Sequence, residues 1–261
     1  MGTDKRERQK ANRQARLAEM ERAQRRSTSR KKVIRIGIIV VLALVAAFGL
    51  SRLIGQDDEG VAASDTSLAT TVPETTVPDI TGETPCPAAD GSTERATSFE
   101  NPPPMCIDPA KAYTATIDTS EGSFTVALDA TKAPQTVNNF VVLSRYHFYD
   151  GLTFHRIVPS FVVQGGDPLG TGSGGPGYEF EDELPASLED YTAGSVAMAN
   201  SGPGTNGSQF FVTLTDTGLD GPKYSLFGRV TEGFDTTVKA LESAGQAGTV
   251  PTITSITITE S

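Results

Sequence analysis

FHRIVPSFVVQGGD, residues 154–167, is the stretch of this chain that decides its fold. Its apolar residues alternate imperfectly with polar ones, which predicts two short strands with a bend at Pro159 and Ser160. Arg156 stands among apolar residues, and an unpaired guanidinium facing a core would be costly. We therefore expect Arg156 to point into a groove, with its five N–H donors directed at a partner.

A second stretch, VAMANSGPGTNGSQFFVT at residues 196–213, surrounds a loop with two apolar strands. The glycines, proline and asparagines of the loop supply the unusual backbone angles that such a loop needs. Asn200 and Gln209 stand on either side of it. Their amide side chains can both donate and accept hydrogen bonds.

Together the two stretches resemble the cyclophilin family of peptidyl-prolyl cis-trans isomerases. Both strings match in the family's order and at about the family's separation, and the likeness runs from about Tyr113 to the C-terminus. The resemblance implies a mainly β fold, a closed eight-stranded antiparallel β-barrel capped by two α-helices. Many short alternating segments and two helical ones favour the same architecture.

The other elements follow from local patterns. Residues 112–129 alternate apolar and polar around the turn at 120–122, which predicts a hairpin. Residues 133–145 place apolar side chains on one helical face, and Pro134 suits the first turn of a helix. A short helix near residues 234–241 and a last strand at 252–259 complete the expected domain.

The resemblance also implies a chemistry that needs no covalent intermediate, metal or cofactor. Amide resonance opposes rotation of an X-Pro bond by about 18–20 kcal/mol. Arg156 matches the family's catalytic arginine, which would donate to the proline nitrogen as that nitrogen regains its lone pair in the twisted state. Gln164 would orient Arg156 and bind the peptide backbone. The walls of the proline pocket would be Phe161, Val162 and Phe211.

Further residues match the family's substrate contacts. Ala199, Asn200 and Ser201 match a strip that pairs with the main chain of the substrate, and Gln209 matches another polar contact. His155 would have a supporting role near the substrate carbonyl. The residues expected to be catalytic are Arg156, Phe161, Gln164 and Asn200.

Residue types alone allow plainer interpretations. Phe161 and Phe211 could be core aromatics, and Arg156 could be half of an internal ion pair. Asn200 and Gln209 could simply tie down their own loop. His155 could be a satisfied structural histidine.

The pattern departs from the family beyond the second stretch. The family often has a Trp and a His at the rim of the proline pocket, where this chain has Leu219 and Tyr224, and Val162 replaces a usual Met. In the family the Trp helps to bind cyclosporin. We therefore expect isomerase activity with weak cyclosporin binding.

The N-terminal part of the chain differs in charge from the rest. Residues 1–35 hold 13 Lys+Arg and 4 Asp+Glu, a net of +9. This leaves 9 of the 22 Lys+Arg and 28 of the 32 Asp+Glu to the remaining residues, a net of −19. Because an apolar run follows the basic tail directly, we expect the tail to meet a membrane surface rather than nucleic acid.

The apolar run IGIIVVLALVAAFGL, residues 36–50, is uncharged and predicts a membrane-spanning helix. Extended to residue 55, and with flanking arginines that snorkel, it approaches the usual span of about 20 residues. A cleaved signal peptide is the alternative; the long basic region and the distant small-residue cleavage site favour a retained anchor. The basic flank places the N-terminus in the cytoplasm.

Cys86 and Cys106 are the only cysteines; Cys86 lies between two prolines, and Cys106 follows Pro104 by two residues. In an extracytoplasmic segment such a pair predicts a disulfide that stabilises by roughly 3 kcal/mol; free thiols are the alternative. Both lie outside the resemblance, so neither is expected to be a nucleophile. With no histidine nearby they predict no metal site.

The sequence thus predicts a cytoplasmic tail (1–35), an anchor (36–55), a Thr/Pro-rich linker (56–108) and a cyclophilin-like isomerase domain (109–261). The domain is expected to be a monomer that acts on proline-containing segments of exported proteins, as in a membrane-anchored bacterial form at a Gram-positive-like cell envelope. The alternative is a non-catalytic module that tethers such segments.

Overall fold

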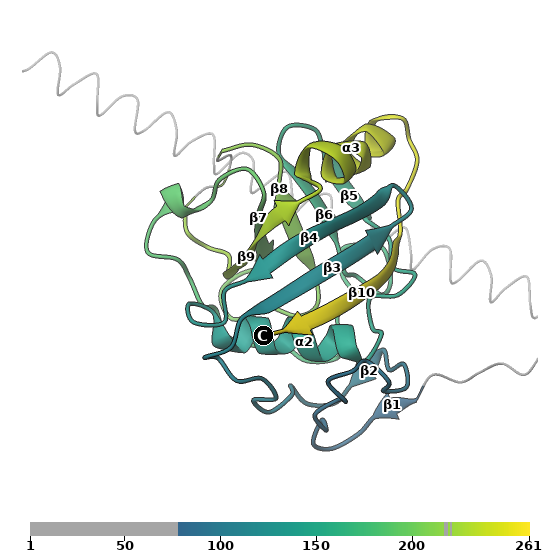
Figure 1. Ribbon diagram of the computed structural model, residues 1–261, viewed down its shortest axis with the longest axis vertical. Helices are drawn as coiled ribbons and strands as arrows, with labels where there is room; N and C mark the ends of the chain where they lie inside the picture. The colour runs from purple at the N-terminus through teal and green to yellow at the C-terminus, as the bar shows by residue number, and fades with distance from the viewer. Residues whose placement is uncertain (1–77, 217–218, 220) are drawn as a thin grey trace, which may run out of the picture. The chain divides into compact units, whose positions relative to one another are not determined.

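The computed structural model describes residues 78–216, 219 and 221–261 (Figure 1). The predicted tail, the anchor at 36–55 and the linker up to residue 77 lie outside the described residues. Within the described ranges, no helix is both long and apolar enough to cross a membrane.

One antiparallel sheet of eight strands forms the body of the domain, in the order β10-β3-β4-β9-β7-β8-β6-β5 (Figure 1). The two stretches singled out in the sequence supply β5 to β8, so the chain returns to one region of the sheet. The strands are β3 (Tyr113–Thr119), β4 (Gly122–Leu128), β5 (Arg156–Val158), β6 (Val162–Gly165), β7 (Ser195–Met198), β8 (Phe210–Thr213), β9 (Leu226–Glu232) and β10 (Ile253–Glu260).

The sheet is curled but does not close into a barrel, so the predicted closed barrel is wrong in this respect. Its edge strands β10 and β5 are not paired with each other. Instead Thr153 forms a single bridge to Thr252, before either strand begins. β5 has only three residues, and all three pair with β6. α3 (Lys239–Gln246) packs against β5, where a Cβ built on Gly245 would lie 2.7 Å from Ile157 Cβ.

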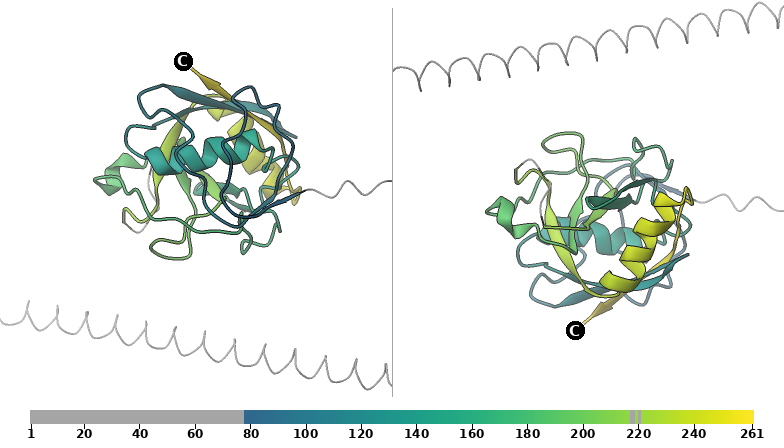
Figure 2. Two further views of the ribbon diagram at one scale, coloured as in Figure 1. Left: turned by 90° about the horizontal axis from the view of Figure 1, so that it is seen from below. Right: turned by 90° about the horizontal axis from the view of Figure 1, so that it is seen from above.

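Two α-helices of the described chain cover the two ends of the curled sheet (Figure 2). α2 (Pro134–Arg145) begins at Pro134, as predicted, and its Phe140 packs against Phe210 and Phe227 at 5.5 and 5.2 Å between ring centroids. At the other end, a π-helical turn, η2 (Phe234–Val238), leads into α3. The predicted helix at 234–241 therefore starts correctly and continues further. A short 3₁₀ turn, η1, spans Leu188–Asp190.

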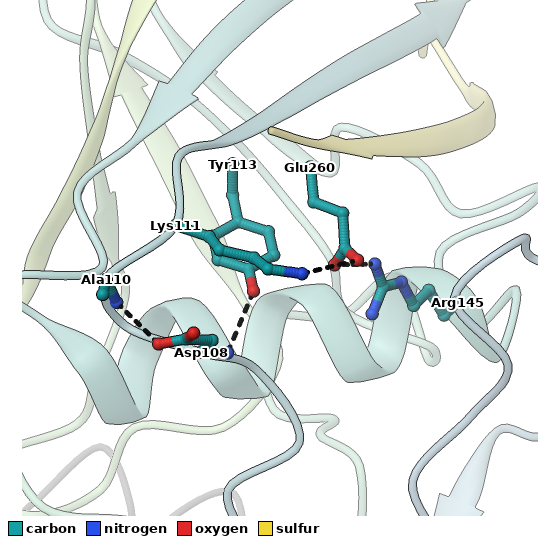
Figure 3. A network of polar contacts seen from close by, with 6 residues as sticks. All are labelled: Asp108, Ala110, Lys111, Tyr113, Arg145 and Glu260. Carbon is teal, nitrogen blue, oxygen red and sulfur yellow. Dashed lines mark hydrogen bonds and ion pairs between the residues drawn. The ribbon is translucent and has the colours of Figure 1, made fainter.

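The C-terminal strand is tied to α2 by an ion-pair network (Figure 3). Arg145, at the end of α2, donates to Glu260 at 2.9 Å, and Lys111 lies 3.5 Å from the same carboxylate. The hydrogen bond from Arg145, aided by Lys111, holds the pKa of Glu260 below its usual value. Nearby, the backbone N–H of Asp108 donates to the hydroxyl of Tyr113 at 3.0 Å.

Residues 79–107 belong to the folded domain, which corrects the linker predicted to end at residue 108. β1 (Asp79–Ile80) pairs in parallel with β2 (Ser98–Phe99), and Ala96 and Phe99 are buried. Cys86 and Cys106 form a disulfide, as predicted. The few apolar residues of this segment follow neither a helical nor a strand period, so their burial could not be seen in the sequence.

Candidate active site

Strand pairing brings the predicted residues onto one outer face of the sheet. Arg156 on β5 pairs with Gln164 on β6, and Gln164 pairs with Phe211 on β8. Phe211 in turn pairs with Ala197 on β7. Paired residues point to the same face of a sheet, whereas their neighbours along each strand point to the opposite face. Those neighbours enter the main core: Val163, Val212 and Val196.

This outer face carries a second apolar cluster, separate from the main core. Val162 and Phe211 are 2% and 4% exposed, although they point away from the main core. The ring of Tyr224 stands edge-on to Phe211 at 5.3 Å. The partly buried residues packed on this cluster include Phe161, Leu188, Ala199, Leu219, Tyr224 and Leu226. The sheet thus carries an apolar cluster at the positions expected for the proline pocket.

Arg156 lies beside this surface and is held by one neighbour. Its Nη1 donates to Gln164 Oε1 at 3.3 Å, and its guanidinium carbon lies 5.8 Å from the centroid of the Phe161 ring. The side chain is exposed. Among the described residues no carboxylate pairs with it, so the internal ion pair considered above is not formed. Most N–H donors of Arg156 therefore remain directed outward.

The turn that carries Phe161 is fixed from α3. Ser160 adopts a positive φ of 56°, and its N–H donates to Glu242 Oε1 at 2.7 Å. Lys239 pairs with the same Glu242 carboxylate at 3.0 Å. The bend predicted at Pro159 and Ser160 is confirmed. Its anchor on a helix about 80 residues later had no signal in the local sequence.

A groove of about 670 Å³ continues from the Gln164 side of this surface. Five predicted residues line one side of it: Gln164, Ala199, Asn200, Ser201 and Gln209. The opposite side is formed by residues 169–178, a glycine-rich loop. Gln164 Nε2 donates to Gln209 Oε1 at 3.0 Å, and Gln209 Nε2 donates to Gly174 O at 2.9 Å. This hydrogen-bonded chain connects Arg156 to the far wall of the groove.

Asn200 shows that a groove residue can also hold its own loop. Its Nδ2 donates to the carbonyl of Lys223 at 2.9 Å and, at 3.4 Å, to Asp182. Asp182 also accepts from the backbone of Gly204 and the side chain of Asn206. Asp182 was not among the expected site residues, because a carboxylate in an acidic stretch gives no local sign of such contacts.

Asp167 is a second residue that sequence reasoning missed. Its side chain is buried, and its carboxylate accepts backbone hydrogen bonds from Leu169 and Thr171 at 2.8 and 2.9 Å and one from Gly172. Burial alone would raise the pKa of Asp167, but these backbone donors, with that of Gly174, lower it below its usual value. Asp167 thereby shapes the glycine-rich wall of the groove. The Gly-Gly-Asp string before the loop was the available signal.

His155 lies behind this wall. A Cβ built on Gly172 would be 3.8 Å from His155 Nε2. Neither ring nitrogen has a hydrogen-bond partner among the described residues, and both atoms are buried. Burial lowers the pKa of His155 below its usual value, because it disfavours the charged form of the ring. His155 is not among the residues that line the groove, and its expected contact with substrate stays a prediction.

A second groove, of about 820 Å³, runs between segments 110–112 and 183–190. It contains none of the expected site residues. Cys86 and Cys106 line neither of these two grooves. The structure thus assembles one site from Arg156, the apolar cluster and the glutamine-lined groove.

Comparison with known proteins identifies relatives of this domain. The family model described as cyclophilin type peptidyl-prolyl cis-trans isomerase/CLD matches residues 114–261. A peptidyl-prolyl cis-trans isomerase-like 1 of Emericella nidulans is 53% identical over 126 residues, which cover 47% of this chain and 77% of the relative. A peptidyl-prolyl cis-trans isomerase of Arabidopsis thaliana is 52% identical over 46% of this chain and 75% of its own length.

A solved structure shows the same fold. The crystal structure of a Cryptosporidium parvum cyclophilin type peptidyl-prolyl cis-trans isomerase has a TM-score of 0.52 and 32% identity. The likeness covers 57% of this chain and 98% of that protein. A second crystal structure of that protein was determined in the presence of the dipeptide Ala-Pro and has a TM-score of 0.51 and 32% identity, over 56% and 98% of the two chains.

Proposed function

The chain belongs to the cyclophilin-type peptidyl-prolyl cis-trans isomerase family, and from that premise we propose that Arg156 and the apolar surface around Phe211 carry its isomerase activity. The observation that supports this assignment most strongly is the position of Arg156. An exposed guanidinium, held by Gln164, lies beside the apolar cluster around Val162 and Phe211 on the outer face of the sheet.

The chemistry requires stabilisation of a twisted amide. As the X-Pro bond rotates, its nitrogen loses resonance and regains a lone pair that can accept a hydrogen bond. The proline ring packs on Phe161, Val162 and Phe211, and Arg156 donates to the nitrogen. This interaction is stronger in the twisted state than in either planar state, which is the condition for catalysis. No covalent bond is made or broken, so neither a nucleophile nor a cofactor is required.

The rest of the peptide follows the groove. Ala199 and Ser201 line one side of it and can offer their backbone carbonyls, because their N–H groups are bonded to Gln209 and Thr205; Gln164 and Gln209 line the same side. The main chain of an extended substrate can form hydrogen bonds with these groups, as a peptide does when it adds as a strand to a sheet edge. The Ala-Pro dipeptide studied with the Cryptosporidium protein supports a proline-containing ligand for this chain.

The rate of isomerisation of an X-Pro tetrapeptide tests the assignment. Arg156→Ala is expected to lower kcat/KM by about 10²–10³-fold, the usual loss when one preorganised donor is removed. Gln209→Ala is the matched control, because it removes a groove amide one hydrogen bond further from the arginine. An unchanged kcat/KM in Arg156→Ala would contradict the donor role of Arg156. No acceleration by a folded protein that still binds proline peptides would favour the non-catalytic peptide-binding module.

We further propose that the domain acts outside the cell membrane on exported proteins. The basic tail followed by an apolar run supports this topology. The Cys86–Cys106 disulfide also supports it, because such bonds persist in oxidising compartments. Protease added to intact cells of the source organism should digest the isomerase domain and spare residues 1–35. Protection of the domain until the membrane is opened would overturn the proposal.

Weak cyclosporin binding is the last part of the proposal. The chain contains no Trp, and Leu219 lies on the apolar surface near the position where the family often has that residue. The smaller side chain offers less apolar area to a large cyclic peptide. A titration of isomerase activity with cyclosporin should give weak inhibition, and inhibition at nanomolar concentrations would contradict this.

A further inference from the structure

We propose that the disulfide-closed segment 79–107 is a positioning element of the substrate groove and acts through Phe99. This inference rests on the proposed function, because it assumes that the substrate chain continues from Arg156 into the groove. The segment lies outside the region matched by the family model, which starts at residue 114. Its contribution to the groove therefore comes from outside the family-matched region.

The backbone of the segment lies directly against the glycine-rich wall of the groove. The N–H of Phe99 donates to the carbonyl of Pro176 at 2.8 Å. Gly177 adopts a φ of +113°, and a Cβ built there would lie 2.3 Å from the carbonyl oxygen of Phe99. No residue other than glycine fits at 177 without moving the two backbones apart. The position of Phe99 thus fixes the wall at its C-terminal end.

The ring of Phe99 reaches the same wall by a second route. It is 1% exposed and stands edge-on to Tyr178, a groove residue, at 6.4 Å. The hydroxyl of Tyr178 donates to Asn139 Oδ1 at 2.6 Å, and Asn139 Nδ2 donates to Gly207 O at 2.9 Å. Gly207 also lines the groove. Two groove positions from different loops therefore depend on the packing around Phe99.

The disulfide and a set of hydrogen bonds hold the segment in place on α2 and the residues that follow it. The N–H of Cys106 donates to Asn138 Oδ1 at 2.7 Å, and Asn138 Nδ2 returns a bond to Pro104 O at 2.9 Å. On the Cys86 side, the hydroxyl of Tyr146 donates to Pro85 O at 2.9 Å. Opening the disulfide would remove one closure of the chain that carries Phe99, while hydrogen bonds such as that from the Ala96 N–H to Tyr146 O at 3.0 Å remain. Reduction of the disulfide should therefore affect the groove in the same way as a Phe99 substitution, but more weakly.

This arrangement predicts an effect that depends on substrate length. The apolar surface and Arg156 receive the proline and its immediate neighbours, whereas the groove receives residues further along the peptide. Loss of Phe99 should disturb only the latter. A general loss of folded protein would instead affect short and long substrates to the same extent.

The test compares three peptides with the full 261-residue chain. One has a single residue on each side of proline, and the others extend it by three residues before or after the proline. The extension that lowers KM in the unaltered protein identifies the peptide end that occupies the groove. Phe99→Leu and Phe99→Ala should remove most of this advantage in KM. For Phe99→Ala the KM of the extended peptide should rise about tenfold, while kcat and the KM of the short peptide stay nearly unchanged.

Phe124→Leu and Phe124→Ala are the matched controls, because Phe124 is also 1% exposed but is not among the groove residues. They should leave the ratio of long-peptide to short-peptide KM unchanged. The double variant Cys86→Ser/Cys106→Ser should shift the ratio in the same direction as Phe99→Leu. It also keeps the test decisive if Phe99→Ala does not fold.

An unchanged ratio in both Phe99→Leu and the double cysteine variant would overturn the inference, as would an equal loss for all three peptides. Failure of the proposed function has a different signature. In that case Arg156→Ala would leave kcat for the short peptide unchanged, whatever the length ratio shows.

Discussion

At the residue scale, Arg156 illustrates what the sequence revealed and what it did not. A cation among apolar residues predicted an outward-facing side chain, and Arg156 is exposed beside Gln164. The further connection, from Gln164 through Gln209 to Gly174, depends on three segments that meet only in the fold. No local pattern encodes such a meeting, so the wall of the groove could not be derived from the sequence.

Asp167 provides a prediction at this scale. Its folded-state pKa is depressed, so its contribution to stability is present above the usual carboxyl pKa and is lost as the pH falls through the lower, folded-state value. The glycine-rich loop should therefore loosen in acid, below about pH 4. Amide hydrogen exchange at Thr171 and Gly172 should accelerate there relative to exchange in β4.

Asp167→Asn should give fast exchange at these amides already at neutral pH and remove the acid dependence. Asp129→Asn is the matched control, because that carboxylate also accepts a backbone hydrogen bond, from Lys132 at 3.1 Å, but lies away from the loop. Slow exchange in Asp167→Asn across the pH range would show that the carboxylate does not hold the loop.

At the element scale, the bounds of α2 could be predicted, but the hydrogen bonds that cap its first turn could not. Pro134 and the apolar face indicated a helix from 133 to 145, and the structure has Pro134–Arg145. The first turn is capped by Glu183, which accepts from the N–H groups of Gln135 and Thr136 at 3.0 and 2.8 Å. The acidic stretch around Glu183 had the composition of a solvated turn. Its role as a cap depends on chain folding over 47 residues.

Removal of this cap should destabilise the domain without changing the chemistry. Glu183→Ala should lower the free energy of unfolding by about 1–2 kcal/mol, because two N–H groups at the helix start lose their acceptor. Chemical denaturation measures this change, and Glu179→Ala, in the same stretch, is the control. Equal stability of the two variants would show that the Glu183 cap contributes little.

At the scale of the whole molecule, the boundary of the domain was the largest error. The sequence predicted the disulfide but placed it in a linker, because prolines surround both cysteines and the apolar residues have no period. In the fold, Phe99 packs against Tyr146, Phe148 and Tyr178. The region that matches the family model therefore needs an additional segment to cover its aromatic residues.

Truncation tests this boundary. Residues 109–261 alone should be less stable than residues 78–261 by at least about 3–5 kcal/mol, the usual cost of removing one large buried aromatic side chain. Thermal or denaturant unfolding compares the two fragments. Equal stability would mean that residues 79–107 only rest on the surface of the domain.

The central claim is that Arg156 acts on the twisted state of the X-Pro bond. Exchange NMR of a proline peptide saturated with the full chain measures the cis–trans interconversion rate of the bound peptide, separately from its Kd. Arg156→Ala is predicted to slow this rate by about 10²–10³-fold while changing Kd by less than about tenfold. An unchanged rate in the bound peptide, with the whole loss in Kd, would contradict the claim and leave Arg156 with a role in binding alone.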